Sequence, residues 1–146
     1  MAATPQYPAF VTVGQAAFNT ANTNRDGTGT LATLYTTRAA GPATGGNGGM
    51  ALWLSVRATA TTTNGMVRVF RHNGTTAFLL MEIPVSAVTP SGTVAAWSLS
   101  SVPTLSALLD PLGRLPLNVA LDPGYSIRIS THNAEAFVAT LDVGEY

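Results

Sequence analysis

The alternation of apolar and polar residues over residues 52–60 constrains the fold of this chain more than any other feature. Every second position is apolar, and the intervening positions hold Trp53, Arg57 and hydroxyl side chains. The apolar positions are Leu52, Leu54, Val56, Ala58 and Ala60. Because successive side chains of a strand point to opposite faces, this period of two predicts a strand that is buried on one side.

Two Asn-Gly pairs follow this strand, and each favours a hairpin because these residues readily adopt the positive φ angles of a tight turn. A two-residue loop at Asn64-Gly65 is expected to return the chain along the first strand. Arg68 and Phe70 would then share the outer face with Arg57.

The second pair, Asn73-Gly74, leads into another apolar stretch. A two-residue loop there would bury Glu82, whereas a three-residue loop over residues 73–75 aligns an apolar set with Val67 and Val69. That set is Leu79, Met81 and Ile83. Register follows the choice that keeps one face apolar, so the longer loop and an antiparallel meander are predicted.

Similar segments recur along the chain between turns rich in Gly, Pro and Asn. The expected strands are residues 10–13, residues 16–20 as a further strand or its continuation, and residues 31–37, 93–99, 116–121, 125–130 and 137–143. A three-residue loop at 132–134 is expected to join the last two as a hairpin, and residues 104–109 to form at most a short helical turn. About eight short strands predict an all-β fold, an antiparallel β-sandwich that is jelly-roll-like.

Composition excludes several classes of protein. The length of 146 residues fits one domain, and the absence of cysteine excludes thiolate zinc sites. Charged residues make up 10% of the chain, against about 25% in typical soluble domains. Seven acidic residues balance seven basic ones, all arginine, so neither nucleic acid nor a membrane surface is an expected partner. No signal peptide is recognised near the N-terminus, and synthesis in a host cytoplasm without general export is expected.

The lack of lysine bears on assembly. Sheet proteins often protect exposed edge strands with charges, lysine above all, and this chain has none. One hypothesis is that its edges are covered by partners, including copies of itself in a dimer or trimer. The alternative is that Thr, Asn and Gly keep the chain soluble unaided.

Two groups of residues are predicted to form an interface. Residues 1–10 are expected to be an extended N-terminal arm that precedes a single β-sandwich domain (residues 11–146). The arm is expected to dock on a partner through Pro5, Tyr7, Pro8 and Phe10. A frayed terminus is the alternative. The second group is the predicted outer face of the first hairpin, since Trp and Arg are favoured at interface centres. It comprises Trp53, Arg57, Arg68 and Phe70. The alternative is a solvent-exposed Arg–Thr face with Trp53 under the glycine-rich loop at 39–50.

No catalytic, metal or cofactor site is predicted. The only histidines, His72 and His132, each precede Asn at an expected hairpin tip, and turn residues are a better interpretation than a metal site of three or four ligands. Residues 22–27 resemble half of a calcium loop, but its twelfth position is Thr33 rather than Glu. Carboxylates are scattered, and no serine stands at a strand-to-helix elbow, so the chain is not expected to be an enzyme.

Four stretches resemble a group of small proteins encoded by tailed bacteriophages and prophages. They are residues 22–29 (NTNRDGTG), 60–68 (ATTTNGMVR), 82–85 (EIPV) and 124–135 (GYSIRISTHNAE). The resemblance implies a virion structural protein without catalytic residues, of the capsid decoration (cement) type, located on the capsid surface with the major capsid protein as partner. The alternative is a tail or fibre module recognising a host-surface glycan, which should carry exposed aromatic rings beside carboxylates in a groove. An enzyme, the third and weakest option, should show a pocket with perturbed titratable groups.

Overall fold

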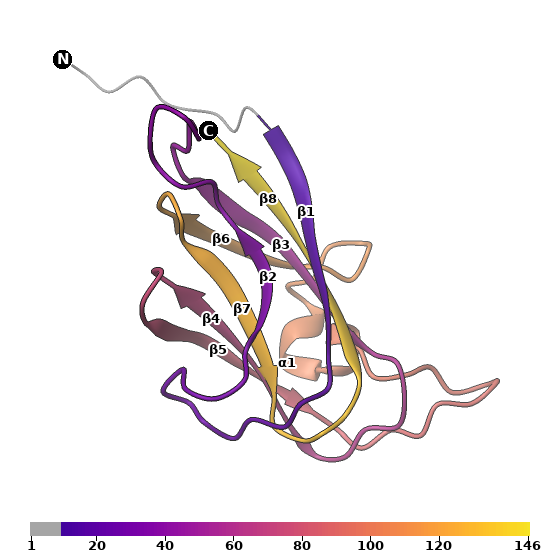
Figure 1. Cartoon of the computed structure of the whole chain (residues 1–146). Coiled ribbons are helices and arrows are strands. Elements are labelled where there is room, and N and C mark those ends of the chain that lie inside the picture. The colour runs from indigo at the N-terminus through magenta and orange to yellow at the C-terminus, as the bar shows by residue number, and fades with distance from the viewer. Residues whose placement is uncertain (1–9) are drawn as a thin grey trace.

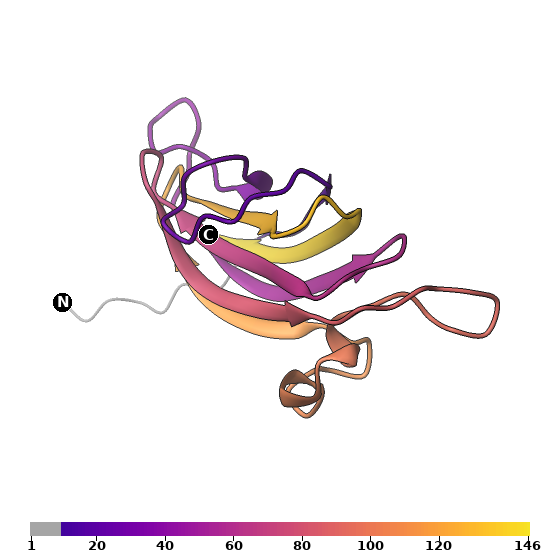
Figure 2. The ribbon, with the colours of Figure 1, turned by 90° about the horizontal axis from the view of Figure 1, so that it is seen from below.

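The chain folds into two antiparallel four-stranded sheets packed face to face (Figures 1 and 2). The computed structural model describes residues 10–146. The strands are β1 (Phe10–Phe18), β2 (Ala32–Thr36), β3 (Gly49–Ala58), β4 (Gly65–His72), β5 (Ala77–Val85), β6 (Leu115–Leu121), β7 (Ser126–Thr131) and β8 (Phe137–Glu145). A 3-10 turn η1 (Leu99–Ser101) and a short helix α1 (Pro103–Ser106) lie between β5 and β6. The predicted all-β sandwich is confirmed.

The strand order is that of a jelly roll. One sheet has the order β1-β8-β3-β6 and the other β2-β7-β4-β5. The first strand therefore pairs with the eighth, the second with the seventh, the third with the sixth and the fourth with the fifth. These nested pairs alternate between the two sheets, which is the arrangement of an eight-stranded jelly roll.

The core lies between the sheets and consists of the apolar faces that the alternation predicts. Leu54, Val56 and Ala58 of β3 are buried against Val67 and Val69 of β4 and their neighbours in the same cluster. Inward-facing residues of β7 and β8 complete the core: Ile127, Ile129, Phe137, Ala139, Leu141 and Val143. Each buried aliphatic side chain of this kind contributes about 1.5–3 kcal/mol relative to an exposed one, so burial of the two faces holds the sheets together.

The predicted central meander is wrong at its first turn. Asn64-Gly65 does not join paired strands, because β3 and β4 belong to different sheets and the chain crosses the sandwich between them. The loop at residues 132–136 likewise carries the chain from β7 in one sheet to β8 in the other, so the predicted last hairpin is also wrong. The period of two identifies which face of a strand is buried. It does not identify the sheet to which the strand belongs, because the strands of both sheets bury an apolar face.

The β4–β5 hairpin exists, with a loop one residue longer than predicted. His72 pairs with Ala77, and Val67 and Val69 pair with Ile83 and Met81, which confirms the face assigned to these two residues of β5. A β-bulge then shifts the register between Val69 and Phe70 and sets Leu79 opposite Phe70. Leu79 is consequently exposed rather than inward.

A second bulge changes the face of Leu52. The register of β3 against both neighbours shifts between Ala51 and Trp53, and a bulge places one extra residue against its partner strand. Ala51 therefore takes the inward position, while Leu52 is only partly buried. The predicted inward position of Ala60 is wrong as well, because β3 ends at Ala58 and Ala60 is exposed.

The segment between β5 and β6 (residues 86–114), drawn in salmon in Figures 1 and 2, adds to the core. It buries Trp97, Leu99 and Val102 completely, and the Trp97 ring stands edge-on to Phe137 with centroids 5.8 Å apart. Residues 93–99 form no strand, contrary to prediction, and make only an isolated bridge between Ser98 and Arg57. Within residues 10–146, no helix has the length and apolarity needed to cross a membrane.

Candidate interaction surfaces

The four residues predicted to share one outer face do not do so. Trp53 and Arg57 lie on β3, whereas Arg68 and Phe70 lie on β4 in the opposite sheet. Arg68 and Phe70 are also fully buried. The prediction fails because it depended on a β3–β4 hairpin, and of the four residues only Arg57 is exposed.

Arg68 is part of an internal polar cluster. Its Nε donates to Glu82 Oε1 at 2.8 Å, and its Nη1 donates to the backbone oxygen of Asn22 at 3.1 Å. Arg25 Nε also donates to Glu82 Oε1, at 2.8 Å. Hydrogen bonds from Arg25 and then Arg68 lower the pKa of Glu82. Asn22 and Arg25 belong to the β1–β2 loop (residues 19–31), so Arg68 attaches this loop to the sheet.

The β1–β2 loop is closed by its own side chains, as the interpretation of residues 22–27 as a turn requires. Asn22 Nδ2 donates to the backbone oxygens of Thr28 and Thr30, each at 2.9 Å. Asp26 Oδ1 accepts from the backbone and the hydroxyl of Thr28, and the hydroxyl hydrogen bond, followed by the backbone one, lowers the pKa of Asp26. Among residues 10–146 no cluster of three or more His, Asp or Glu is arranged to hold a metal ion.

Trp53 is covered by an arginine from the segment that precedes β6. The Arg114 guanidinium carbon lies 5.2 Å from the centroid of the Trp53 ring. Arg114 also forms ion pairs with Asp142 at 2.6 Å and with Asp110 at 2.7 Å. Trp53 thus has a cationic partner within the chain, Arg114.

The predicted arm lies largely outside the described residues. Pro5, Tyr7 and Pro8 are among the residues outside the range 10–146. Phe10, which was assigned to the arm, is the first residue of β1 and pairs with Glu145.

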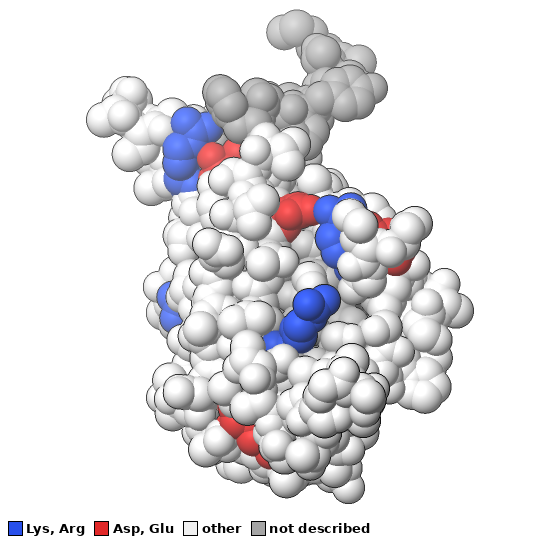
Figure 3. All heavy atoms as spheres, turned by 90° about the vertical axis from the view of Figure 1, so that its right-hand side faces the viewer, with Lys and Arg blue, Asp and Glu red and all other residues white. Residues whose placement is uncertain are grey.

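The structure adds an exposed, mostly apolar region to these candidates, on the outer surface of β1 and the adjoining end of β8, and we call it the β1–β8 face. It consists of Val11, Val13, Gln15 and Ala17 of β1 with Val138 of β8. Asp142 of β8, which is paired with Arg114, stands opposite Val13 at its border. Val11 and Val13 are 70% and 58% exposed. A shallow hollow of about 490 Å³ lies over Gln15, Ala17 and Val138. Figure 3 views the molecule from the right-hand side of Figure 1, where separate positive and negative side chains are scattered over a mostly uncharged surface.

Sequence reasoning missed this face, although part of the signal was present. The segment FVTVGQAAF over Phe10–Phe18 alternates from Val11 onward. Two β-branched residues at alternate positions fit either the buried or the exposed face of a strand. The buried set here is Gly14 and Phe18, and glycine gives no hydrophobic signal to mark it.

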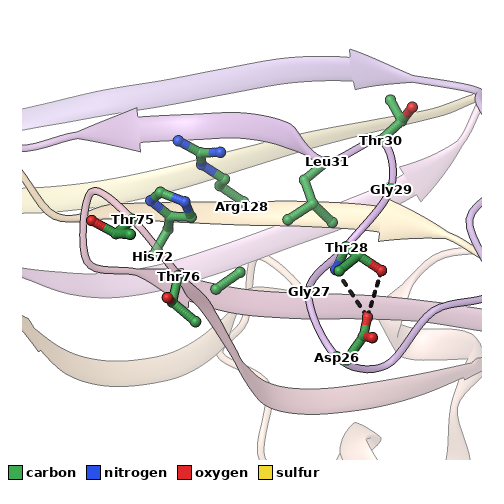
Figure 4. A pocket seen from close by; sticks show the side chains of 11 residues that line it. Asp26, Gly27, Thr28, Gly29, Thr30, Leu31, His72, Thr75, Thr76 and Arg128 are labelled. Carbon is green, nitrogen blue, oxygen red and sulfur yellow. Dashed lines mark hydrogen bonds between the residues drawn. The ribbon is translucent and has the colours of Figure 1, made fainter.

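A groove of about 500 Å³ separates the β1–β2 loop from the tip of the β4–β5 hairpin (Figure 4). Its lining includes Asp26, His72 and Arg128 with several threonines. His72 Nδ1 accepts a hydrogen bond from the backbone of Gly74 at 3.0 Å, and burial, followed by the charge of Arg128, lowers the pKa of His72. No Phe, Tyr or Trp lines the groove, so it does not present the aromatic platform expected of a glycan site.

Comparisons of the chain with models of protein families, with curated proteins and with solved structures gave no match in any of the three.

Proposed function

We propose that this chain is a structural protein of a tailed-phage virion, and that it decorates the capsid by binding between subunits of the major capsid protein. The observation that carries the proposal is the β1–β8 face, an exposed apolar strand surface at the edge of a sheet. Exposed apolar patches on small domains mark sites of association. The phage setting comes from the four stretches of sequence that resemble phage proteins.

The distribution of charge supports binding by apolar contact. Four of the seven arginines form ion pairs within the chain, namely Arg25, Arg38, Arg68 and Arg114. Their carboxylate partners are thereby engaged too, which leaves little charge for a partner. A protein attached to a shell in this way would rely on buried apolar area.

The fold is compatible with the proposal without selecting it. Jelly rolls occur in viral capsid proteins and also in lectins, and a fold shared by many functions identifies none of them. The alternative function, a tail or fibre module that recognises a host glycan, is supported less well because the groove beside His72 has no aromatic ring in its lining.

Cryo-electron microscopy of phage particles assembled with and without the chain tests the proposal. The expected result is added density on the outer capsid surface, contacting at least two shell subunits. Density confined to the tail or fibres would favour the glycan-binding alternative. Particles that contain no copy of the chain would refute both.

A further inference from the structure

Within residues 10–146 the two sheets end in four edge strands, and these edges differ in their protection. The edges are β1 and β6 in one sheet and β2 and β5 in the other. An edge strand presents unpaired N–H and C=O groups to any passing strand, and proteins block such pairing with proline, charge, bulges or very short strands.

Three of the four edges carry such protection. β5 contains Glu82 and Pro84 and lies beside the bulge at Val69 and Phe70. β6 contains Pro116 and has Asn118 in the left-handed region at φ 51°. β2 is only five residues long and its register shifts between Thr33 and Tyr35.

β1 carries none of these devices. It is nine residues long, contains no proline and no charged residue, and pairs with β8 in continuous register. The side chains of Val11 and Val13 are open to solvent on its outer surface. Its inner surface is closed, because β2 passes so near Gly14 that a Cβ added there would collide with the carbonyl oxygen of Leu34. A partner can therefore approach β1 along its free edge and its outer surface.

We propose that the free edge of β1 pairs antiparallel with β1 of a second copy of this chain. A two-fold axis near Thr12 sets Val11 of each copy opposite Val13 of the other, and cross-strand pairs of β-branched residues stabilise a sheet. Because β1 contains no charged residue, pairing of two copies of this strand brings no like charges together. The product is a closed dimer with an eight-stranded sheet, since one patch serves both sides of a two-fold interface.

This inference deepens the proposed function, and it rests on that function only for its biological role. A dimer joined through β1 would present two copies of the groove and of the β4–β5 hairpin. It could span two neighbouring shell subunits. The pairing itself is a property of the isolated chain and is tested without particles.

Analytical ultracentrifugation of the purified chain measures the pairing. The wild type is expected to be a dimer, and Val13→Lys to raise the dimer dissociation constant at least about tenfold, equivalent to about 1.4 kcal/mol. Lysine on an edge strand opposes pairing, and the exposed position of Val13 leaves the fold intact. Leu112→Lys is the matched control, because Leu112 is 74% exposed and lies outside β1; it should leave the dissociation constant unchanged.

Cross-linking tests the register. The chain has no cysteine, so the double substitution Val11→Cys and Val13→Cys places thiols only on the open outer surface of β1. The proposed axis sets position 11 of each copy opposite position 13 of the other, at Cα separations of about 4.5–5.5 Å that a disulfide can bridge. Mild oxidation should give a covalent dimer, whereas Leu112→Cys should stay monomeric on a denaturing gel.

A monomeric or trimeric wild type, or a Val13→Lys variant that dimerises as tightly as the wild type, would overturn the proposal. Absence of a cross-link in a dimeric sample of the Val11→Cys and Val13→Cys variant would overturn the β1 register. The two proposals fail separately. A dimer that never binds particles would refute decoration alone, and a monomer that saturates particles would refute β1 pairing alone.

Discussion

Arg68 of β4 and Glu82 of β5 stand opposite each other in register, and the arginine Nε lies 2.8 Å from the glutamate Oε1. The arginine side chain is 1% exposed and that of the glutamate is 28% exposed. The pair thus connects the interior of the molecule to its surface. Through Asn22 and Arg25 it also holds the β1–β2 loop.

Replacing Arg68 by methionine keeps most of the side-chain volume and removes these hydrogen bonds. The free energy of unfolding of Arg68→Met is expected to fall by about 1.5–3 kcal/mol, the range for a hydrogen bond to a charged group. Urea denaturation measures the change. Arg57→Met is the control on an exposed strand position and should shift stability by less than about 0.5 kcal/mol. Equal effects of the two substitutions would contradict the structural role of Arg68.

Gly14 allows β1 and β2 to approach. Gly14→Ala is expected to destabilise the fold by about 1–3 kcal/mol, because the added methyl group meets the Leu34 carbonyl and the strands must separate. At Gly92 an added Cβ has nothing within 4 Å. Gly92→Ala should therefore be neutral or stabilising by up to about 1 kcal/mol. Thermal unfolding of both variants decides the matter, and an unchanged midpoint for Gly14→Ala would show that β2 does not lie so close to β1.

Glu145 is expected to make stability depend on acid pH. Burial raises the pKa of its carboxyl, but hydrogen bonds from Arg38 and the Tyr35 hydroxyl outweigh burial, and the pKa lies below its ordinary value of 4.5. The unfolded chain therefore takes up the proton first as the pH falls. The stabilisation is complete above pH 4.5 and is lost as the pH falls through the folded pKa.

Glu145→Gln should consequently lower stability at neutral pH and flatten its decline in acid. Urea denaturation at pH 7, 4.5 and 3 measures both effects. The decline should flatten without vanishing, since Glu82 and Asp110 also have lowered pKa values in the folded chain. A decline in the variant as steep as in the wild type would assign the acid sensitivity to other carboxylates.

Attachment to the capsid is expected to be insensitive to salt. Surface ion pairs contribute only about 0–1 kcal/mol each, and the arginines at positions 25, 38, 68 and 114 are already paired within the chain. Particles carrying the chain should retain it when sodium chloride is raised from 0.05 to 1 M, within about 1 kcal/mol of binding free energy. Sedimentation of particles, with quantification of the bound chain, checks this. Release by moderate salt would show that charge dominates the contact.

The buried faces could be predicted from the sequence, but most strand partners could not. Alternation predicts that Leu54, Val56 and Ala58 face inward, and each is buried. Alternation is a local property, whereas the assignment of β3 and β4 to different sheets depends on the return of β8 and β7 from the far end of the chain. The two bulges add a second limit, because a one-residue shift at Leu52 reverses a face without any change in composition.

The candidate surface was harder to predict for the same reason. The alternation predicts that Arg68 lies on an outer face, but the β1–β2 loop packs over it and buries it. A period of two carries no information about where a loop lies. Its partner Glu82 could have been found by asking which carboxylate stands opposite Arg68 in the β4–β5 hairpin. Val11 and Val13 could not have been recognised as exposed, because Gly14 gave no sign that it faces the core.

The position of β8 has a consequence for how the molecule forms. β8 is the last of the eight strands along the chain, yet it lies between β1 and β3 in the middle of its sheet. Before β8 folds, β1 has no neighbouring strand in its own sheet, and Phe10 lacks its pairing partner Glu145. Pairings between such distant residues make folding slow. The sheet that contains β1 therefore cannot close before the eighth strand has been made, and its completion is a late, long-range step of folding.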